Sequence, residues 1–299
     1  MSAQRHLTDW LLLLGLVVVW GISFALTKIA IAGPSPLWVM ALRLAIGAVA
    51  LYIVMRLYGQ RLPIDKTTLI WFSWLGTVGA IIPFFLISWG AQYLPSGLVG
   101  ISMAVMPLVT IALAHFILPD EPLTRRKLIG FLIGFAGLVL LVGPQLLGEL
   151  KLTGNGPLAQ LAVLVAAAAY SVQAVTARKL PPMNSLQKST GVMLASAIIG
   201  VFLALLFDPF GLRLDNQMAN LSTLALGLFP TALAALLLFR LLDRTDASFV
   251  SIVNYLLPPF AYFLGIIALA EPFESRALLG LAVILAGIYL AERSRTTPS

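Results

Sequence analysis

Polar and aromatic side chains recur at helical spacing inside the apolar stretches of this chain. Residues three or four positions apart share one face of a helix, so each group can form one wall of a cavity. Aromatic rings stack on aromatic or cationic ligands, and amide or hydroxyl groups orient the polar end of a ligand. The candidate ligand-binding residues are Trp20, Ser23, Phe24, Phe84, Ser88, Trp89, Tyr170, Gln173, Asn254, Tyr255 and Tyr262. The alternative is that the hydroxyl groups pack helix against helix and that the aromatic rings form interfacial belts.

Prolines inside several of the apolar stretches are candidate hinges. Proline removes one intrahelical hydrogen bond and bends the helix that contains it. These residues are Pro83, Pro107, Pro230 and Pro258, and they fall in corresponding elements of the two halves of the chain. We expect them to permit gating movements; a static kink, which membrane helices tolerate, is the alternative.

A few basic groups lie within the apolar stretches or at their ends. They are Lys28, Arg43 and His115, with Arg240 near the end of another stretch. An ionisable group inside a membrane is a functional candidate by default, whereas a long side chain near a helix end can extend to the lipid headgroups instead. Arg43 is the least able to do so, and we expect it to pair with carbonyl oxygens or with a group in the cavity.

No aspartate or glutamate falls in the middle of an apolar stretch. Proton-coupled exporters commonly carry the proton on an intramembrane carboxylate, so we expect no obligatory proton coupling. His115 is the one residue whose ordinary pKa, about 6.5, suits proton exchange, and a single histidine near a helix end is more often structural. The chain has no cysteine and no clustered metal ligands, so the sequence predicts no metal site, no cofactor and no enzymatic nucleophile and base.

The composition requires a bilayer around the chain. Hydrophobic residues make up 60% of the 299 residues and charged residues 10%, and the mean hydropathy is +0.99. This leaves too little polar surface to cover a water-soluble globule. The net charge of +7 is scattered between the apolar stretches, so it indicates membrane topology rather than nucleic-acid binding.

Ten apolar runs are long enough to cross about 30 Å of hydrocarbon as helices. They are residues 10–32, 36–56, 68–92, 95–118, 127–144, 157–177, 189–207, 219–241, 247–270 and 275–292. Their length and their lack of two-residue alternation favour helices over barrel strands. The first run also resembles a cleaved signal peptide, but its end has a counterpart deep inside the chain, which a cleaved leader should not have.

The distribution of lysine and arginine predicts the orientation. If the N-terminus is cytoplasmic, the inner segments hold 14 of the 19 lysines and arginines and the outer loops hold three. Cytoplasmic loops of membrane proteins carry the excess of basic residues, so both termini are predicted to be cytoplasmic.

The chain contains a long internal repeat. Residues 121–141 return 150 positions later as residues 271–291, with a Glu-Pro pair, an arginine and two glycines in register. Five spans per half is an odd number, so the halves 1–150 and 151–299 are predicted to enter the membrane from opposite faces. Such inverted repeats commonly hold a substrate near the midplane between the halves. The Glu-Pro pairs lie outside the apolar spans, and we expect them to connect helices.

Several of these stretches resemble one transporter superfamily. WGISFALTK in the first span, ALRLAIGAVAL in the second, and a Glu-Pro before a glycine-rich last helix in each half are similar to the EamA-type branch of the drug/metabolite transporters. The resemblance covers nearly the whole chain. It implies an all-α membrane fold of ten helices in a basket, with a central cavity lined mainly by spans 1, 3, 4, 6, 8 and 9. Tyr170 and Gln173 stand where the first half has Trp20 and Ser23, so the two sides of the cavity should differ chemically.

Within that branch, the aromatic spans resemble bacterial exporters of aromatic amino acids and paraquat. This implies export or facilitated movement of small amphipathic metabolites, such as aromatic or other neutral amino acids, by alternating access in the bacterial inner membrane. The expected partners are the bilayer and a small-molecule substrate; the oligomeric state stays open, and a monomer is plausible. The alternatives are an exchanger of nucleotide-linked or phosphorylated metabolites, which needs several cavity cations, and, less favoured, an intramembrane enzyme or a channel.

Overall fold

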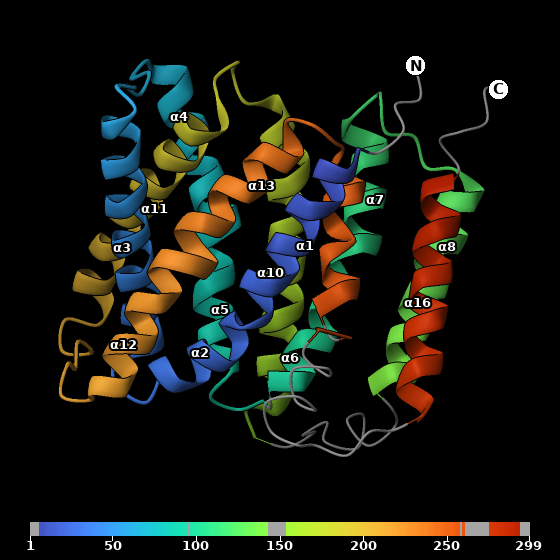
Figure 1. Cartoon of the computed structure of the whole chain (residues 1–299). Helices are drawn as coiled ribbons and strands as arrows, with labels where there is room; N and C mark the ends of the chain where they lie inside the picture. The colour runs from blue at the N-terminus through green and yellow to red at the C-terminus, as the bar shows by residue number, and fades with distance from the viewer. Residues whose placement is uncertain (1–5, 95, 143–153, 258, 261–274, 294–299) are drawn as a thin grey trace.

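A computed structural model describes residues 6–94, 96–142, 154–257, 259–260 and 275–293, and the regular structure in these residues is helical (Figure 1). Six helices are long and apolar enough to cross a membrane, and they are Leu7–Ala30, Pro36–Leu57, Lys66–Gly90, Gly156–Lys179, Ser185–Phe207 and Gln217–Leu242. Shorter apolar helices cover Met106–Ile117, Ala247–Leu257 and Leu278–Ala291. The count of ten spans stays a prediction, because the expected span 247–270 extends beyond the described residues.

The helices follow the expected spans closely. The first half contains α1 (Leu7–Gly21), α2 (Ser23–Ala30), α3 (Pro36–Leu57), α4 (Lys66–Gly76), the π-helix η1 (Thr77–Ile81), α5 (Ile82–Gly90), α6 (Ser96–Met103), α7 (Met106–Ile117) and α8 (Arg125–Val142). The second half contains α10 (Gly156–Thr176), the 3₁₀-helix η2 (Ala177–Lys179), α11 (Ser185–Phe207), α12 (Gln217–Leu226), the π-helix η3 (Gly227–Leu233), α13 (Ala234–Leu242), α14 (Ala247–Ser251) and α16 (Ser275–Arg293).

Capping residues explain where several helices begin. The Ser35 side chain accepts a hydrogen bond from the Trp38 amide and Pro36 follows it, so α3 starts at a favoured N-cap and first-turn sequence. At α11, Asn184 and Gln187 form a reciprocal capping box. Both pairs are local in sequence, which is why the predicted and observed starts of these helices lie within a few residues of each other.

Wide π-helical turns occur at equivalent places in the two halves. η1 and η3 begin 150 residues apart, in the third helix of each half. Pro83 follows η1 in the first turn of α5, and Pro230 lies inside η3. Because proline cannot donate the amide hydrogen bond that an α-helix requires, the backbone at these points departs from regular α-helical geometry.

Equivalent helices of the two halves pack against each other: α3 packs on α11, and α8 packs on α16. α8 and α16 stand side by side at one edge of the bundle (Figure 1). The repeated glycines form their contact, because a Cβ on Gly130 would lie 2.6 Å from the carbonyl oxygen of Gly287 and one on Gly137 would lie 2.9 Å from that of Gly280. Small residues of this kind let membrane helices approach backbone to backbone.

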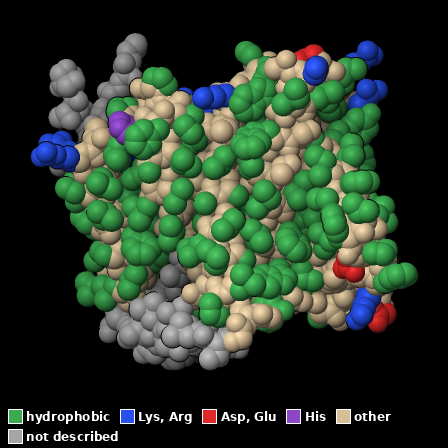
Figure 2. All heavy atoms as spheres, turned by 180° about the vertical axis from the view of Figure 1, so that it is seen from behind, with side chains coloured by type: hydrophobic (Ala, Val, Ile, Leu, Met, Phe, Trp, Pro, Cys, Tyr) green, Lys and Arg blue, Asp and Glu red, His purple; other side chains and the backbone are tan. Residues whose placement is uncertain are grey.

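One end of the bundle holds the first turn of α1 and the last turn of α16 (Figure 1), and we call it the terminal face. α1 begins and α16 ends there (Figure 1), and lysine and arginine side chains gather along the same upper edge of a largely hydrophobic surface (Figure 2). Ion pairs tie elements together at this face, including Arg244 to Asp9 at 2.6 Å and Lys188 to Asp243. The basic edge is the side that the charge distribution predicts to be cytoplasmic.

Candidate substrate cavity

A cavity lies between the two halves of the bundle. It contains about 640 Å³ of space not filled by atoms, counting the part open to solvent. Its lining comes from the first, second, third, fourth, sixth, eighth and ninth expected spans. The lining residues are Trp20, Ser23, Phe24, Arg43, Phe84, Ile87, Met103, Met106, Tyr170, Gln173, Ala174, Leu238, Val250, Asn254 and Leu257. The lining is therefore mostly apolar and aromatic, with a few polar groups, as is common for small-molecule sites.

The first wall is formed where α1 passes into α2. The two helices are separate segments on either side of Ile22, and Trp20, Ser23 and Phe24 stand around this break. Gly21 allows a close contact there, because a Cβ at this position would lie 2.3 Å from the ring of Phe260. The glycine thus lets another helix approach beside the residues that line the cavity.

Three aromatic rings from different helices meet in the cavity. The rings of Trp20 and Tyr170 are 6.4 Å apart, and the rings of Phe84 and Tyr170 are also 6.4 Å apart, at an interplanar angle of 65°. Tyr170 on α10 therefore contacts one ring from α1 and one from α5. This arrangement joins the first half of the chain to the second at the cavity wall.

Arg43 is a buried cation in the lining. Its Nε donates a hydrogen bond to the hydroxyl oxygen of Thr231 at 3.0 Å, and its Cζ lies 3.7 Å from the centre of the Phe84 ring. Thr231 belongs to η3, so the π-helical turn supplies the acceptor across the interface of the halves. The guanidinium group is thus fixed by one hydrogen bond and one cation–π contact.

Two amide side chains are among the neutral polar groups of the lining, beside the hydroxyl groups of Ser23 and Tyr170. Gln173 packs against Gly79 so closely that a Cβ on the glycine would lie 1.9 Å from the Gln173 Cδ. Asn254 donates from Nδ2 to the carbonyl oxygen of Ser251 at 3.3 Å, and the same nitrogen lies 3.0 Å from the sulfur of Met106. Both amides are almost fully buried, so their positions are set by packing on all sides.

The structure brings together seven of the eleven predicted ligand-binding residues. These are Trp20, Ser23, Phe24, Phe84, Tyr170, Gln173 and Asn254. Tyr262 and the predicted hinge Pro258 lie outside the described residues.

The other three predicted ligand-binding residues lie away from the cavity lining. Ser88 is fully buried and has no hydrogen-bond partner among the described residues, and Trp89 packs against Tyr93 with ring centres 5.1 Å apart. Tyr255 donates to the carbonyl oxygen of Phe131 on α8 at 2.8 Å. Through this bond it anchors the peripheral helix α8, whereas the preceding Asn254 lines the cavity.

Lys28 and His115 also have structural contacts. Lys28 donates from Nζ to the carbonyl oxygen of Ala91 at 2.6 Å and faces a smaller neighbouring pocket. His115 is exposed and its Nδ1 accepts a hydrogen bond from the Leu123 amide at 3.2 Å. Of the three predicted intramembrane charges, Arg43 is therefore the one that lines the cavity.

The predicted hinges Pro83, Pro107 and Pro230 all mark interruptions of regular α-helix. Pro83 and Pro230 accompany the π-helical turns η1 and η3, and Pro107 stands at the start of α7, just after the break that separates α7 from α6. All three are buried. Their role in gating stays a prediction.

Some lining residues were not predicted from the sequence. Ile87, Ala174, Val250 and Leu257 could have been found, because each lies three or four positions from a predicted lining residue on the same helix. Met103, Met106 and Leu238 carry no such signal, since apolar side chains on these helices look alike in the sequence.

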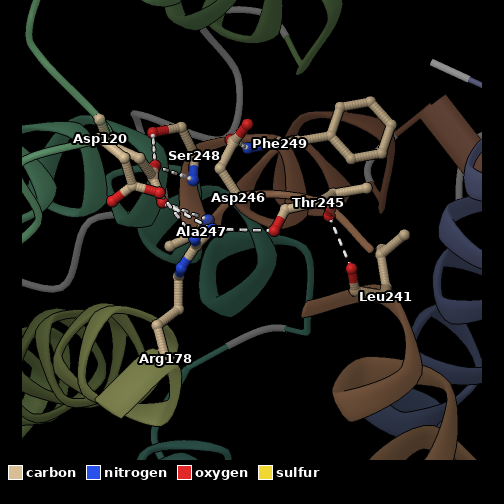
Figure 3. A network of polar contacts seen from close by, with 9 residues as sticks. Asp120, Arg178, Leu241, Thr245, Asp246, Ala247, Ser248 and Phe249 are labelled. Carbon is tan, nitrogen blue, oxygen red and sulfur yellow. Dashed lines mark hydrogen bonds and ion pairs between the residues drawn. The ribbon is translucent and has the colours of Figure 1, made fainter. Parts of the chain in front are cut away.

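Glu121, from the repeated Glu-Pro motif, is buried at the terminal face. Its carboxylate accepts hydrogen bonds from the amides of Ala247 and Ser248 and from the Ser248 hydroxyl, at 3.0, 3.2 and 2.8 Å, and pairs with Arg178 at 3.3 Å. Figure 3 shows Arg178 and Ser248 pointing towards the same carboxylate, beside Asp120. The motif therefore does more than connect helices: it fixes the start of α14, the element that carries Val250 towards the cavity.

Among the described residues, no group of three or more histidines or acidic side chains could hold a metal ion. The cavity has instead the means to bind a small organic molecule through aromatic faces, two amides and one cation. Together with six helices of membrane-spanning length, this defines the class of protein as a multi-pass membrane transporter.

Comparisons with known proteins give the family. Residues 8–143 and 157–293 each match the EamA-like transporter family, so the chain belongs to it. An uncharacterized transporter of Bacillus subtilis is 24% identical, covering 93% of this chain and 94% of that protein. An aromatic amino acid exporter of Ancylobacter novellus is 25% identical over 74% of this chain and 76% of its own length. A crystal structure that covers 95% of this chain and 98% of its own has a TM-score of 0.78 at 22% identity, which shows a shared fold.

Proposed function

We propose that the protein exports, or facilitates the movement of, small amphipathic metabolites, with aromatic and other neutral amino acids as the substrate class. The observation that carries the proposal is the cavity lining, in which four aromatic rings, two amides and one guanidinium surround a space between the halves. Aromatic rings suit the side chain of such a substrate and also attract its ammonium group. The similarity to an aromatic amino acid exporter supports the same class.

Movement of the substrate is proposed to occur by alternating access. The halves would rock about the cavity and expose it first to one membrane face and then to the other. The matching π-helical turns η1 and η3 support this proposal, because they interrupt equivalent helices beside the cavity. Buried prolines at or beside these turns remove hydrogen bonds that would otherwise resist bending.

Facilitated movement down the substrate gradient is proposed rather than obligatory proton coupling. Among the described residues that line the cavity there is no aspartate, glutamate or histidine. A proton-coupled cycle needs a group in the transport path that binds and releases the proton at ordinary pH. A strict requirement for a pH gradient during counterflow contradicts this part of the proposal.

The contacts of the other basic groups argue against the exchange of phosphorylated metabolites. Such a substrate carries at least two negative charges and favours several cavity cations. Lys28 already donates to a backbone carbonyl beside a separate pocket, and Arg240 is exposed. Arg43 is therefore the single cation that the described lining offers, which suits a substrate with one negative group.

Reconstituted transport tests the proposal directly. Purified protein in liposomes is loaded with unlabelled amino acid, and counterflow of radiolabelled phenylalanine, tryptophan, leucine and glutamate is measured with and without a pH gradient. We expect flux of the first three, and we expect Trp20→Ala, Gln173→Ala and Asn254→Ala to reduce it. Trp71→Ala is the matched control, since Trp71 is a partly buried tryptophan outside the cavity lining. Absence of flux for the whole panel, or equal flux in all variants, rejects the proposal.

A further inference from the structure

Arg43 is an arginine without an acidic partner among the described residues. It is 3% exposed and lies in the middle of α3, a helix of membrane-spanning length. Buried charges in proteins are normally paired, because the loss of hydration strongly disfavours an isolated ion. The described cavity lining contains no carboxylate that could pair with it. A permanent positive charge held in this way is suited to an anion that arrives from outside the protein.

The contacts of Arg43 position it without neutralising it. The side chain donates one hydrogen bond among the described residues, from Nε to Thr231, although a guanidinium has five N–H donors. The ring of Phe84 lies against the guanidinium, with 3.7 Å between the ring centre and Cζ. Thr231 and Phe84 come from the second and the first half, so the orientation of Arg43 depends on the arrangement of both.

We propose that Arg43 binds the carboxylate of the transported substrate, and that the cavity therefore selects apolar or aromatic monocarboxylates. Two adjacent N–H groups of a guanidinium match the two oxygens of a carboxylate, which makes the contact both strong and directional. Phe84 contacts the guanidinium, Tyr170 neighbours Phe84, and Trp20 neighbours Tyr170, so these rings provide apolar contact for the rest of such a molecule. This inference deepens the proposed function and rests on the same cavity.

The number of charges sets the ligand class. One guanidinium pairs with one carboxylate, whereas a phosphate monoester would leave a second negative charge without a partner. A neutral amide of the same shape would lose the charge-assisted hydrogen bonds, and the buried cation would again be unpaired. The expected signature is therefore a preference for the acid over its amide, and this preference should depend on Arg43.

The test uses two ligand pairs that differ in this group alone: 3-phenylpropionate with 3-phenylpropanamide, and phenylalanine with phenylalaninamide. Binding of radiolabelled 3-phenylpropionate to purified full-length protein in detergent is competed with each compound. We expect the wild-type protein to bind each acid about tenfold or more tightly than its amide. In Arg43→Gln the ratio should fall to about one. Arg56→Gln is the matched control, because Arg56 is an exposed arginine on the same helix.

The ratio of acid affinity to amide affinity separates substrate binding by Arg43 from a purely structural role of this residue. If Arg43 only braces the helices, Arg43→Gln weakens acid and amide equally and the wild-type ratio persists, which overturns the inference. A wild-type ratio near one also overturns it. If Arg43→Gln does not give folded protein, Arg43→Lys decides: a ratio below that of the wild type supports carboxylate binding, and an unchanged ratio contradicts it.

Failure of the proposed function gives a different pattern. If no amino acid is transported but 3-phenylpropionate binds with a preference that requires Arg43, the amino-acid assignment is wrong and the carboxylate site stands. If phenylalanine is transported equally well by the wild type and by Arg43→Gln, the assignment stands and the carboxylate site is wrong.

Discussion

The buried carboxylate of Glu121 offers the sharpest test of how the terminal face is held together. Its partners are two backbone amides and one hydroxyl at the start of α14, and the guanidinium of Arg178. Glu121→Ala removes all four interactions at once. The neighbouring Asp120 contacts the same arginine at 2.7 Å, but its side chain is 60% exposed, whereas that of Glu121 is fully buried.

The expected loss of unfolding free energy follows from these differences in burial. Loss of an N-cap interaction costs about 1 kcal/mol, and removal of one partner of a buried ion pair costs about 3–5 kcal/mol. In Glu121→Ala, Arg178 keeps its bond to the Thr245 carbonyl and its pair with Asp120 (Figure 3). The lower end of the ion-pair range therefore applies, and we expect the free energy of unfolding to fall by about 3 kcal/mol. Asp120→Ala removes an exposed pair and should cost less than about 1 kcal/mol.

Thermal unfolding of the purified protein in detergent measures this difference. At about 2 °C per kcal/mol, Glu121→Ala should lower the Tm by about 6 °C and Asp120→Ala by no more than about 2 °C. Glu121→Gln keeps one acceptor oxygen and should fall between them. Equal Tm values for the two alanine variants refute the reasoning, because burial would then not decide the strength of the two contacts to Arg178.

Three further predictions concern the cavity and the peripheral helix pair. Gly79→Ala should displace the whole Gln173 side chain, since the added Cβ would lie 1.9 Å from its Cδ and 2.4 Å from its Cγ, and raise the KM of counterflow about fivefold in the protein that folds; an unchanged KM removes Gln173 from the binding surface. Gly287→Val should sharply reduce the yield of monodisperse protein, because even a Cβ would lie 2.5 Å from a backbone nitrogen of α8. Leu285→Val, on the exposed side of the same helix, is its control. Tyr255→Phe removes one hydrogen bond to an α8 carbonyl and should lower the Tm by about 2 °C, corresponding to about 1 kcal/mol; a large rise in KM instead would return this residue to the substrate site.

Local signals in the sequence were sufficient for the helices and for part of the cavity. A long apolar run needs a helix in a bilayer wherever it lies in the chain, so the described helices match the predicted spans to within a few residues at their ends. Helical spacing also grouped Trp20, Ser23 and Phe24, which all belong to the cavity lining. Spacing alone does not say which face of a helix points inwards when several faces carry aromatic residues.

That choice separates the predicted residues that line the cavity from those outside its lining. Asn254 and Tyr255 are adjacent, and successive residues on a helix are about 100° apart, so they face different neighbours. Asn254 lines the cavity, whereas Tyr255 bonds to α8. Ser88 and Trp89 do not belong to the cavity lining, whereas Phe84 and Ile87 of the same helix do.

The sequence by itself determined a membrane protein built from two matched halves, because hydrophobicity, basic loops and the repeat are properties of the chain alone. The tertiary structure decided which polar groups meet. Arg43 lies 188 positions from the threonine that orients it, and Glu121 lies 126 positions from the amide it caps. Contacts at such separations depend on how the helices cross, and a hydrogen bond or ion pair forms only when its atoms come within a few ångströms of each other.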